Sequence, residues 1–155
     1  MRSKTNKFNA VKTTANGIKF DSKYESQVYL KLRHILRLES IHCHHRAAYL
    51  GENGPDKRLC ISNAYWRVDF MIKDGSKSLF AIEAKGRFTQ PDKFKFLLWE
   101  LYQNIPLIVV HSERNKPRGL HSSGLVHFLV WEQFNLMSGK DLVELVKVIK
   151  NRCRG

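Results

Sequence analysis

Cysteine is scarce in this sequence, and long apolar runs are absent. The 155 residues include three cysteines, Cys43, Cys60 and Cys153, an odd number without the spacing of a zinc site. We therefore expect reduced thiols, as in a cytoplasm, rather than a disulfide framework. No segment approaches the roughly 20 apolar residues of a membrane span, and the amino terminus lacks the apolar core of a secretory signal. These absences favour a cytoplasmic protein with no membrane partner.

Acidic residues are also in short supply. Fourteen Asp and Glu stand against 27 Lys and Arg, which leaves a net charge of +13 with neutral histidines. Such an excess indicates an anionic partner, and nucleic acid is the commonest one for a small domain. An acidic membrane surface is the rival, but no segment combines a basic face with a broad apolar one. Charge alone does not separate an enzyme from a binding protein.

The length and a hydrophobic content of 43% suit one compact domain with a real core. Residues 1–19 contain basic residues and no acid, so they are expected to form a basic arm, with a short strand near residues 17–20. A single domain is expected over residues 20–155.

The hydrophobic periodicity within that domain predicts a mixed α/β fold. Helices are expected over residues 22–38, 90–103, from 131, and over 141–152. Strands are expected over residues 42–50, 57–61, 65–72, 79–85, 105–111 and 126–130. We expect Trp66, Val68, Phe70 and Ile72 on one face of their strand, and Trp66 and Trp99 in the core.

Charged residues interrupt the strand that ends in "AIEAKG", residues 81–86. Because strand side chains alternate, Glu83 and Lys85 point to the same side of the sheet. The Asp-Gly hairpin before it, with a five-residue loop over 74–78, places Asp69 directly across from Glu83. Glu25 lies near the centre of the apolar stripe of its helix. The pattern therefore predicts that three carboxylates and one amine come together.

Three buried carboxylates cannot all remain ionised without a compensating cation. Oxygen ligands suit Mg²⁺ or Mn²⁺, and such an ion can activate water and stabilise charge on a phosphate. Lys85 could polarise the attacking water and offset the same charge. In a chain of net charge +13, the substrate expected for such a site is a phosphodiester.

Each of these residues also has a simpler interpretation. Ser22 and Glu25 match a helix capping box, which alone would account for Glu25. Glu83 and Lys85 could pair with neighbours on a solvated sheet face. The convergence with Asp69 is what favours a site.

Two further stretches leave alternatives open. The histidines and cysteine of residues 42–45 invite a zinc interpretation, but no second ligand pair follows, and surface or DNA-facing histidines are the simpler alternative. The basic loop over residues 112–124 could hold phosphates or could be an ordinary solvated loop.

A helical Glu25, then Val68-Asp69, then Glu83-Ala84-Lys85 resembles the PD-(D/E)xK nuclease superfamily, with Val68 where that pattern has Pro. The chain is more closely similar to phage endonuclease I-type Holliday-junction resolvases and related small phage nucleases, with matching segments in order over residues 20–112. The interval from Asp69 to Glu83 is longer than in those resolvases, and no segment able to swap between subunits is evident.

The resemblance implies a restriction-endonuclease-like mixed central sheet flanked by helices. It implies that Glu25, Asp69, Glu83 and the Ala84 carbonyl bind Mg²⁺ or Mn²⁺, and that Lys85 is catalytic. We accordingly expect a metal-dependent DNA endonuclease that prefers branched or Holliday-junction DNA, acting inside a bacterial or phage-infected cell. The alternatives are a sequence-specific endonuclease of homing or transposon-end type and a catalytically silent DNA-binding protein with this fold.

The expected DNA contacts come from the basic arm, the second long helix and the basic loop. They are Lys4, Lys7, Lys12, Lys19, Lys93, Lys95, Arg114, Lys116 and Arg118. Since cutting both strands needs two sites, a homodimer is expected.

Overall fold

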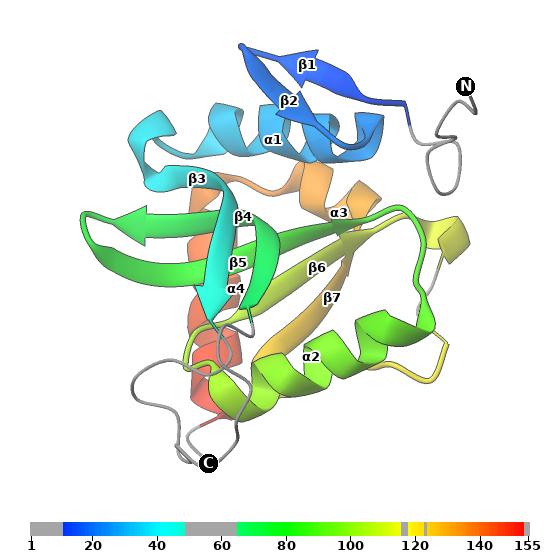
Figure 1. Cartoon of the computed structure of the whole chain (residues 1–155). Coiled ribbons are helices and arrows are strands. Elements are labelled where there is room, and N and C mark those ends of the chain that lie inside the picture. Colours follow the sequence, from blue (N-terminus) through cyan, green and yellow to red (C-terminus); the bar gives the residue numbers. More distant parts are fainter. Residues whose placement is uncertain (1–10, 49–64, 116–117, 123, 154–155) are drawn as a thin grey trace.

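A five-stranded mixed sheet forms the centre of the molecule (Figure 1). The computed structural model describes residues 11–48, 65–115, 118–122 and 124–153. The spatial order of the strands follows the chain: β3 (Ile41–Ala48), β4 (Tyr65–Asp74), β5 (Lys77–Lys85), β6 (Leu107–His111) and β7 (Val126–Val130). The first two pairings are antiparallel and the last two are parallel.

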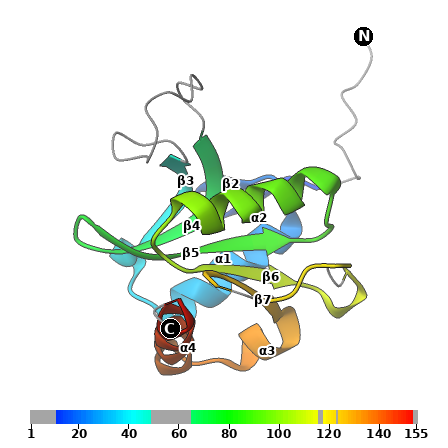
Figure 2. The same ribbon diagram turned by 90° about the horizontal axis from the view of Figure 1, so that it is seen from below.

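Helices cover both faces of this sheet (Figure 2). On one face lie α1 (Lys23–Ile35), α3 (Trp131–Leu136) and α4 (Gly139–Arg152), and on the other lies α2 (Gln90–Tyr102). Short 3₁₀ turns, η2 (Leu38–Ser40) and η3 (Glu113–Asn115), follow α1 and β6. This is the mixed α/β, restriction-endonuclease-like architecture that the sequence predicts. None of the described helices is long and apolar enough to cross a membrane.

Most element boundaries agree with the sequence-based predictions. The helix α1 is shorter than expected because its C-cap residue, Leu36, has an extended backbone. The strand expected over residues 57–61 lies outside the described residues.

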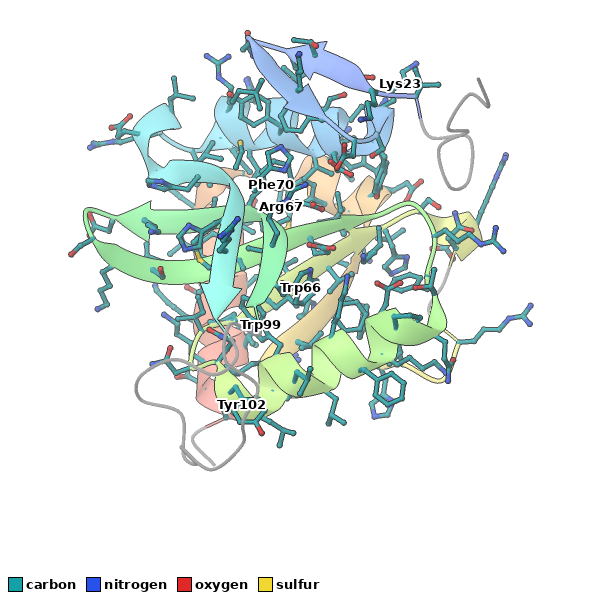
Figure 3. The ribbon with its side chains drawn as sticks, viewed as in Figure 1. Lys23, Trp66, Arg67, Phe70, Trp99 and Tyr102 are labelled. Atoms are coloured by element: carbon teal, nitrogen blue, oxygen red, sulfur yellow. The ribbon has the colours of Figure 1, made fainter. Side chains whose placement is uncertain are left out.

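The sheet separates two hydrophobic cores. One packs the inner sides of α1, α3 and α4 on the sheet, and the other packs α2. In the second core the rings of Trp66 and Trp99 meet edge to face with centroids 5.6 Å apart, and the Trp99 indole N–H donates to the Ile105 carbonyl at 2.8 Å. Figure 3 shows both indoles toward α2, whereas Phe70 points toward α1. The prediction that both tryptophans are core residues is confirmed.

The alternation of β4 reverses in its middle, which corrects one prediction. Trp66 and Val68 pack in the α2 core, but Phe70 and Ile72 pack in the core on the α1 side. The regular pairing of β3 with β4 skips the point where His44 faces Asp69, and His44 has a positive φ of 53°. A local change in backbone conformation of this kind re-aims the side chains that follow it. Asp69 lies at the point of this change.

The β4–β5 hairpin is tighter than predicted. Asp74 pairs with Lys77, so the turn holds only Gly75 and Ser76 instead of five residues. A register shift between Ile72 and Lys73 compensates for the shorter turn. Beyond it, Phe70 pairs with Ile82, and the same register places Asp69 opposite Glu83, as the sequence predicted.

A small hairpin precedes α1 and packs against it. It consists of β1 (Thr13–Ala15) and β2 (Ile18–Phe20), joined by Asn16 and Gly17 with φ angles of 49° and 79°. Positive φ at both turn residues is what a type I′ hairpin requires, and Asn-Gly is its commonest sequence. The strand predicted near residues 17–20 is β2, whereas its partner β1 was not predicted.

Candidate active site

The carboxylates of Asp69 on β4 and Glu83 on β5 each accept a hydrogen bond from the backbone of the other strand. Asp69 Oδ2 accepts a hydrogen bond from the Ala84 N–H at 2.8 Å, and Glu83 Oε2 accepts one from the Asp69 N–H at 3.3 Å. The regular pairing of the two strands ends just before this point, at Phe70 and Ile82. The side-chain oxygens thus accept hydrogen bonds from backbone N–H groups that would otherwise pair the two strands. Where this regular pairing ends, the two strands are open and the two acids face each other.

Lys85 lies between two buried carboxylates. Its Nζ is 2.9 Å from Glu83 Oε1 and 3.0 Å from Asp92 Oδ1. Glu83 and Asp92 are each only 4% exposed. A buried carboxylate needs a partner of opposite charge, and here one ammonium serves both. The prediction that Glu83 and Lys85 lie on one side of the sheet is confirmed, since they form an ion pair, and Lys85 has a second acid, Asp92, as a further partner.

Asp92 is the site residue that the sequence analysis missed. Its Oδ2 accepts hydrogen bonds from both the N–H and the hydroxyl of Thr89, each at 2.7 Å, which caps the start of α2. Its other oxygen holds Lys85. The sequence indicates only the cap, because an acid in the first turn is typical of any helix. Asp141 has the same capping position in α4, and its described contacts are all within its own cap.

Glu25 is a capping residue in this structure. Its N–H donates to the Ser22 hydroxyl at 3.1 Å, while its carboxylate accepts from that hydroxyl and from the Asp21 N–H, both at 3.2 Å. The helix-capping interpretation is therefore confirmed as the direct contact. Glu25 is also half-buried and electrostatically linked to Glu83 and Asp69. Its charge thus belongs to the cluster, although its hydrogen bonds belong to the helix.

Burial raises the pKa of all three acids, and neighbouring carboxylates add to this rise at Asp69 and Glu25. Burial, then the charges of Glu83 and Glu25, hold the pKa of Asp69 well above its usual range, despite the Ala84 N–H and Lys85. Burial also raises the pKa of Glu83 and of Glu25. A cluster whose members repel each other and lack water is short of positive charge.

The charges around Lys85 work in the opposite direction. Burial alone would lower the pKa of this amine, but Glu83 and Asp92 raise it above its ordinary value. Burial likewise opposes ionisation of Asp92, yet the Thr89 hydrogen bonds and Lys85 lower the pKa of that acid. Lys85 and Asp92 are therefore a stable ammonium–carboxylate pair.

The acidic side chains of the cluster are of the type that binds a hard divalent cation, but their positions are less suited to one. Glu25, Asp69 and Glu83 supply oxygen ligands, which Mg²⁺ and Mn²⁺ prefer. However, no three His, Cys, Asp or Glu side chains in the described ranges are placed so that they could hold a metal ion as they stand. The Lys85 ammonium instead supplies the positive charge beside Glu83.

A basic cleft of about 500 Å³ opens beside the end of β5 and the start of α2. Three residues predicted to contact DNA, Lys93, Arg114 and Arg118, line it together. Arg87 joins them and was not predicted, although it follows the "AIEAKG" segment directly. The remaining lining residues are Phe88, Thr89, Gln90, Asn115 and Leu120, so no acid among the described residues lines this cleft.

Asn115 attaches the basic loop to the site. Its side-chain amide donates to the Gly86 carbonyl and to the Ser112 hydroxyl, the latter at 3.0 Å. Gly86 follows Lys85 directly at the end of β5. The loop that carries the arginines is therefore attached at the end of β5, one residue beyond Lys85.

The other predicted DNA contacts are spread over the chain. Lys12 is exposed and 4.0 Å from an Asp21 oxygen, and Lys19 is exposed on β2. Lys95 turns inward, with its Nζ 5.4 Å from the centre of the Trp66 ring and its charge lowering the pKa of Glu83. Lys4, Lys7 and Lys116 lie outside the described residues.

The His-Cys-His-His segment has structural contacts. A ring nitrogen of His44 is 3.1 Å from the Lys19 carbonyl oxygen, and the ring packs on Phe20. Cys43 is half-buried against the core on the α1 side, and burial raises the pKa of its thiol to about 11. His44 and Cys43 therefore have structural contacts, with β2 and with the core on the α1 side, rather than the surface or DNA-facing position expected of the histidines.

The fold and the site define a mixed α/β protein with an acidic cluster and one lysine at opened strand ends beside a basic cleft. The chain belongs to the family described as "Protein of unknown function (DUF1064)", which matches residues 5–116. That segment contains every acid and lysine of the cluster, while α3 and α4 lie beyond it. No curated protein matches the chain.

Proposed function

We propose that this protein is a metal-dependent endonuclease that hydrolyses phosphodiester bonds in DNA inside the cell. The observation that carries the proposal is the joint position of Asp69, Glu83 and Lys85 at the opened ends of β4 and β5, next to a cleft lined by four cationic side chains. The clustered acids can bind a cation, and the basic cleft, which no acid among the described residues lines, can bind a phosphate.

The residues of the cluster would have distinct roles. Asp69, Glu83 and Glu25, with the Ala84 carbonyl, would hold Mg²⁺ or Mn²⁺. When bound, such an ion supplies an activated water and stabilises charge on the phosphate. Lys85 is an ammonium, because its pKa is raised by two carboxylates. It would therefore donate a hydrogen bond to the attacking water or to the phosphate, and would not act as a proton acceptor.

The proposal extends to branched or Holliday-junction DNA as the preferred substrate. Cations that suit phosphates dominate the cleft, and the sequence has no recognisable zinc-finger or helix-turn-helix motif for reading base sequence. A homodimer would bring two sites to one junction and allow paired cuts. A sequence-specific endonuclease is the alternative, and it would cut one linear duplex sequence in preference to a junction.

The test is a cleavage assay on four-way-junction, supercoiled and linear DNA with Mg²⁺, Mn²⁺ or EDTA. We expect cleavage only with metal, greatest on the junction, and its loss in Glu83→Gln, which preserves shape but removes the charge. Glu39→Gln is the matched control because Glu39 is exposed in η2, away from the cluster. Cleavage that persists in EDTA or in Glu83→Gln would contradict the proposal.

A second candidate is a catalytically silent DNA-binding protein with this fold. The observation in its favour is that Lys85 already neutralises Glu83 at 2.9 Å, while no ready group of three metal ligands stands in the described part of the chain. Tight DNA binding without cleavage under every metal condition would establish this candidate and exclude the nuclease.

Asp92 offers a separate test of the role given to Lys85. In Asp92→Asn, the amide oxygen can still accept from Thr89, so the α2 cap remains, but Lys85 loses one of its two charged partners. We expect cleavage to fall by roughly tenfold or more, since the lysine is held less well for reaction. DNA affinity in EDTA should stay within about twofold, because Asp92 lines no part of the basic cleft.

The control for this variant is Asp141→Asn, which changes the equivalent capping residue in α4. Cleavage by that variant should match the wild type. If cleavage fell equally in Asp92→Asn and Asp141→Asn, helix capping, rather than the charge beside Lys85, would account for the effect of Asp92. The same conclusion would follow if the two variants lost the same thermal stability. Partial recovery in Asp92→Glu would support the charge.

A further inference from the structure

We propose that a second basic hollow, at the carboxyl end of α2, binds a backbone phosphate of the same nucleic acid, about 20 Å from the acidic cluster. We call it the distal pocket. The inference rests on the proposed function only for the identity of the substrate as DNA.

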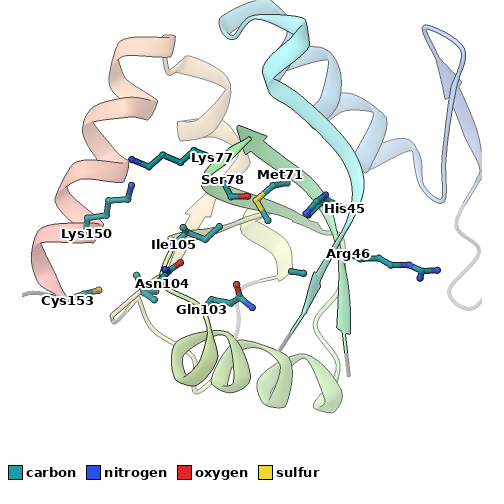
Figure 4. Close-up of a pocket in the computed structure, with 12 residues that line it drawn as sticks. His45, Arg46, Met71, Lys77, Ser78, Gln103, Asn104, Ile105, Lys150 and Cys153 are labelled. Carbon is teal, nitrogen blue, oxygen red and sulfur yellow. The ribbon is translucent and has the colours of Figure 1, made fainter. Parts of the chain in front are cut away.

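The distal pocket has a volume of about 790 Å³ and is formed by five separate parts of the chain (Figure 4). These parts are β3, the β4–β5 hairpin, the connection from α2 to β6, Leu125 just before β7, and the end of α4. Met71 and Ala47, both buried, belong to its lining. A concave site of this size is in the range that holds a nucleotide-sized group.

Two lysines from distant parts of the chain meet at this pocket. Lys77 comes from the hairpin and Lys150 from α4, and Figure 4 shows their ammonium ends on the same side of the pocket. Neither lysine forms an ion pair within the described residues. The described residues that line the pocket include no Asp or Glu. Two unpaired ammonium groups around one hollow repel each other, and an anion between them relieves that repulsion.

Neutral hydrogen-bonding groups accompany the two charges. Ser78 lies beside Lys77 at the hairpin, and Asn104 follows the end of α2. A hydroxyl and an amide among cations are the usual partners of phosphate oxygens in nucleic-acid complexes. The combination therefore favours a phosphodiester.

The helix α2 relates the distal pocket to the basic cleft. Thr89, Gln90 and Lys93 at its start line the cleft, and Gln103 just past its end lines the pocket. With 13 residues, α2 is about 20 Å long at 1.5 Å per residue. Phosphates along one strand repeat every ~3.4 Å, so the two hollows are about six nucleotides apart. One nucleic-acid segment can therefore reach both.

The test measures DNA binding rather than cleavage. Lys77→Gln/Lys150→Gln is compared with Lys140→Gln/Lys147→Gln, which removes the same charge from exposed positions of α4 outside the pocket. Fluorescence anisotropy in EDTA would follow binding to labelled duplexes of about 24 and about 3 base pairs, the shorter one closed by a hairpin loop, from about 50 to about 200 mM salt. At ~3.4 Å per base pair the shorter duplex is about 10 Å long, half the distance between the two hollows. Thermal unfolding of each variant would check that the fold is intact.

We expect the pocket variant to bind the long duplex roughly tenfold or more weakly than the control variant. Its dependence of log affinity on log salt should be shallower than that of the control by about one unit for each phosphate that the pocket no longer binds. The two variants should bind the short duplex alike, because it cannot span both hollows.

Equal binding by the two variants on the long duplex would overturn the distal pocket while leaving the proposed nuclease intact. The same deficit on both duplexes would overturn its placement at a distance from the cluster. Absence of DNA binding by the wild-type protein at every salt concentration would overturn both proposals, so the two failures can be told apart.

Discussion

Replacing Lys85 with Met is expected to lower the free energy of unfolding by about 3 to 5 kcal/mol, even with no DNA or metal added. Lys85 is the shared partner of Glu83 and Asp92, at 2.9 and 3.0 Å, and both acids are buried. Methionine fills the space of the alkyl chain but leaves two carboxylates without their cation. Removing one partner of a buried ion pair costs more than the pair contributes, because the remaining charge has lost its water.

Urea unfolding at neutral pH in EDTA would measure this loss. Lys147→Met is the matched control, since Lys147 pairs with Glu144 on the exposed side of α4 at 3.1 Å. An exposed pair of this kind contributes about 0 to 1 kcal/mol. The deficit of Lys85→Met should shrink on acidification, when Glu83 and Asp92 become protonated. Equal stability of the two variants would mean that the buried network is not a structural requirement.

Lys85→Met is also expected to lose cleavage, by roughly a hundredfold to a thousandfold for loss of one aligned donor. Cleavage is compared at a temperature where the variant remains folded, so that instability is not read as lost chemistry. Cleavage at the wild-type rate in the folded variant would remove Lys85 from the proposed mechanism.

Replacing Asp69 with Asn is expected to have the opposite effect on stability and the same effect on cleavage. The pKa of Asp69 is raised in the folded protein by burial and by the charges of Glu83 and Glu25. A carboxyl with a raised folded pKa binds its proton more tightly in the folded state than in the unfolded state. Its contribution to stability is complete below the unfolded pKa and is lost as pH rises through the folded pKa.

The carboxyl of Asp69 therefore stabilises the fold less at neutral pH than in acid. Asparagine can still accept the Ala84 N–H and carries no charge. We expect Asp69→Asn to gain about 1 kcal/mol, a typical size for relief of functional-site strain, which is roughly 2 to 4 °C in Tm. The gain should disappear at acidic pH, and cleavage should fall by roughly a hundredfold to a thousandfold.

Thermal unfolding followed from acidic to neutral pH would measure the gain, because the raised pKa of Asp69 places its effect above the ordinary carboxyl pKa. Asp74→Asn, an exposed residue of the hairpin, serves as control and should leave Tm unchanged. Added Mg²⁺ or Mn²⁺ should raise the Tm of the wild type but not that of Asp69→Asn, because a ligand stabilises only the state that binds it. If Asp69→Asn had a lower Tm than the wild type at neutral pH, the prediction that removing the Asp69 charge stabilises the fold there would be wrong.

The sequence was sufficient to place Asp69 opposite Glu83, although one step of that prediction was wrong. The hairpin turn is shorter than the predicted loop, and a register shift beside Ile72 makes up the difference. Side chains repeat every two residues in a strand, so a net slip by one would have separated the two acids. The apolar residues of β5, which must face the cores, keep the register that the charges need.

Other features of the site depended on tertiary structure. The face reversal at Asp69 is not visible in the pattern of β4, where Trp66, Val68, Phe70 and Ile72 alternate without interruption. The second role of Asp92 depends on how α2 lies on the sheet, which a capping signal does not specify. Arg87 and the basic loop line one cleft, and the hydrogen bond from Asn115 to the Gly86 carbonyl joins the two segments. Such long-range contacts have no local signature.

The shared use of Asp92 gives α2 a mechanical role. One oxygen of this carboxylate fixes the first turn of the helix and the other fixes the lysine of the cluster. The same helix has one basic hollow at each end. A shift of Lys85 would therefore pull on the helix that spaces the two hollows, and DNA seated in both would in turn resist that shift. Under the proposed function, DNA binding in the two hollows and the position of Lys85 would thus be linked through the Asp92 side chain.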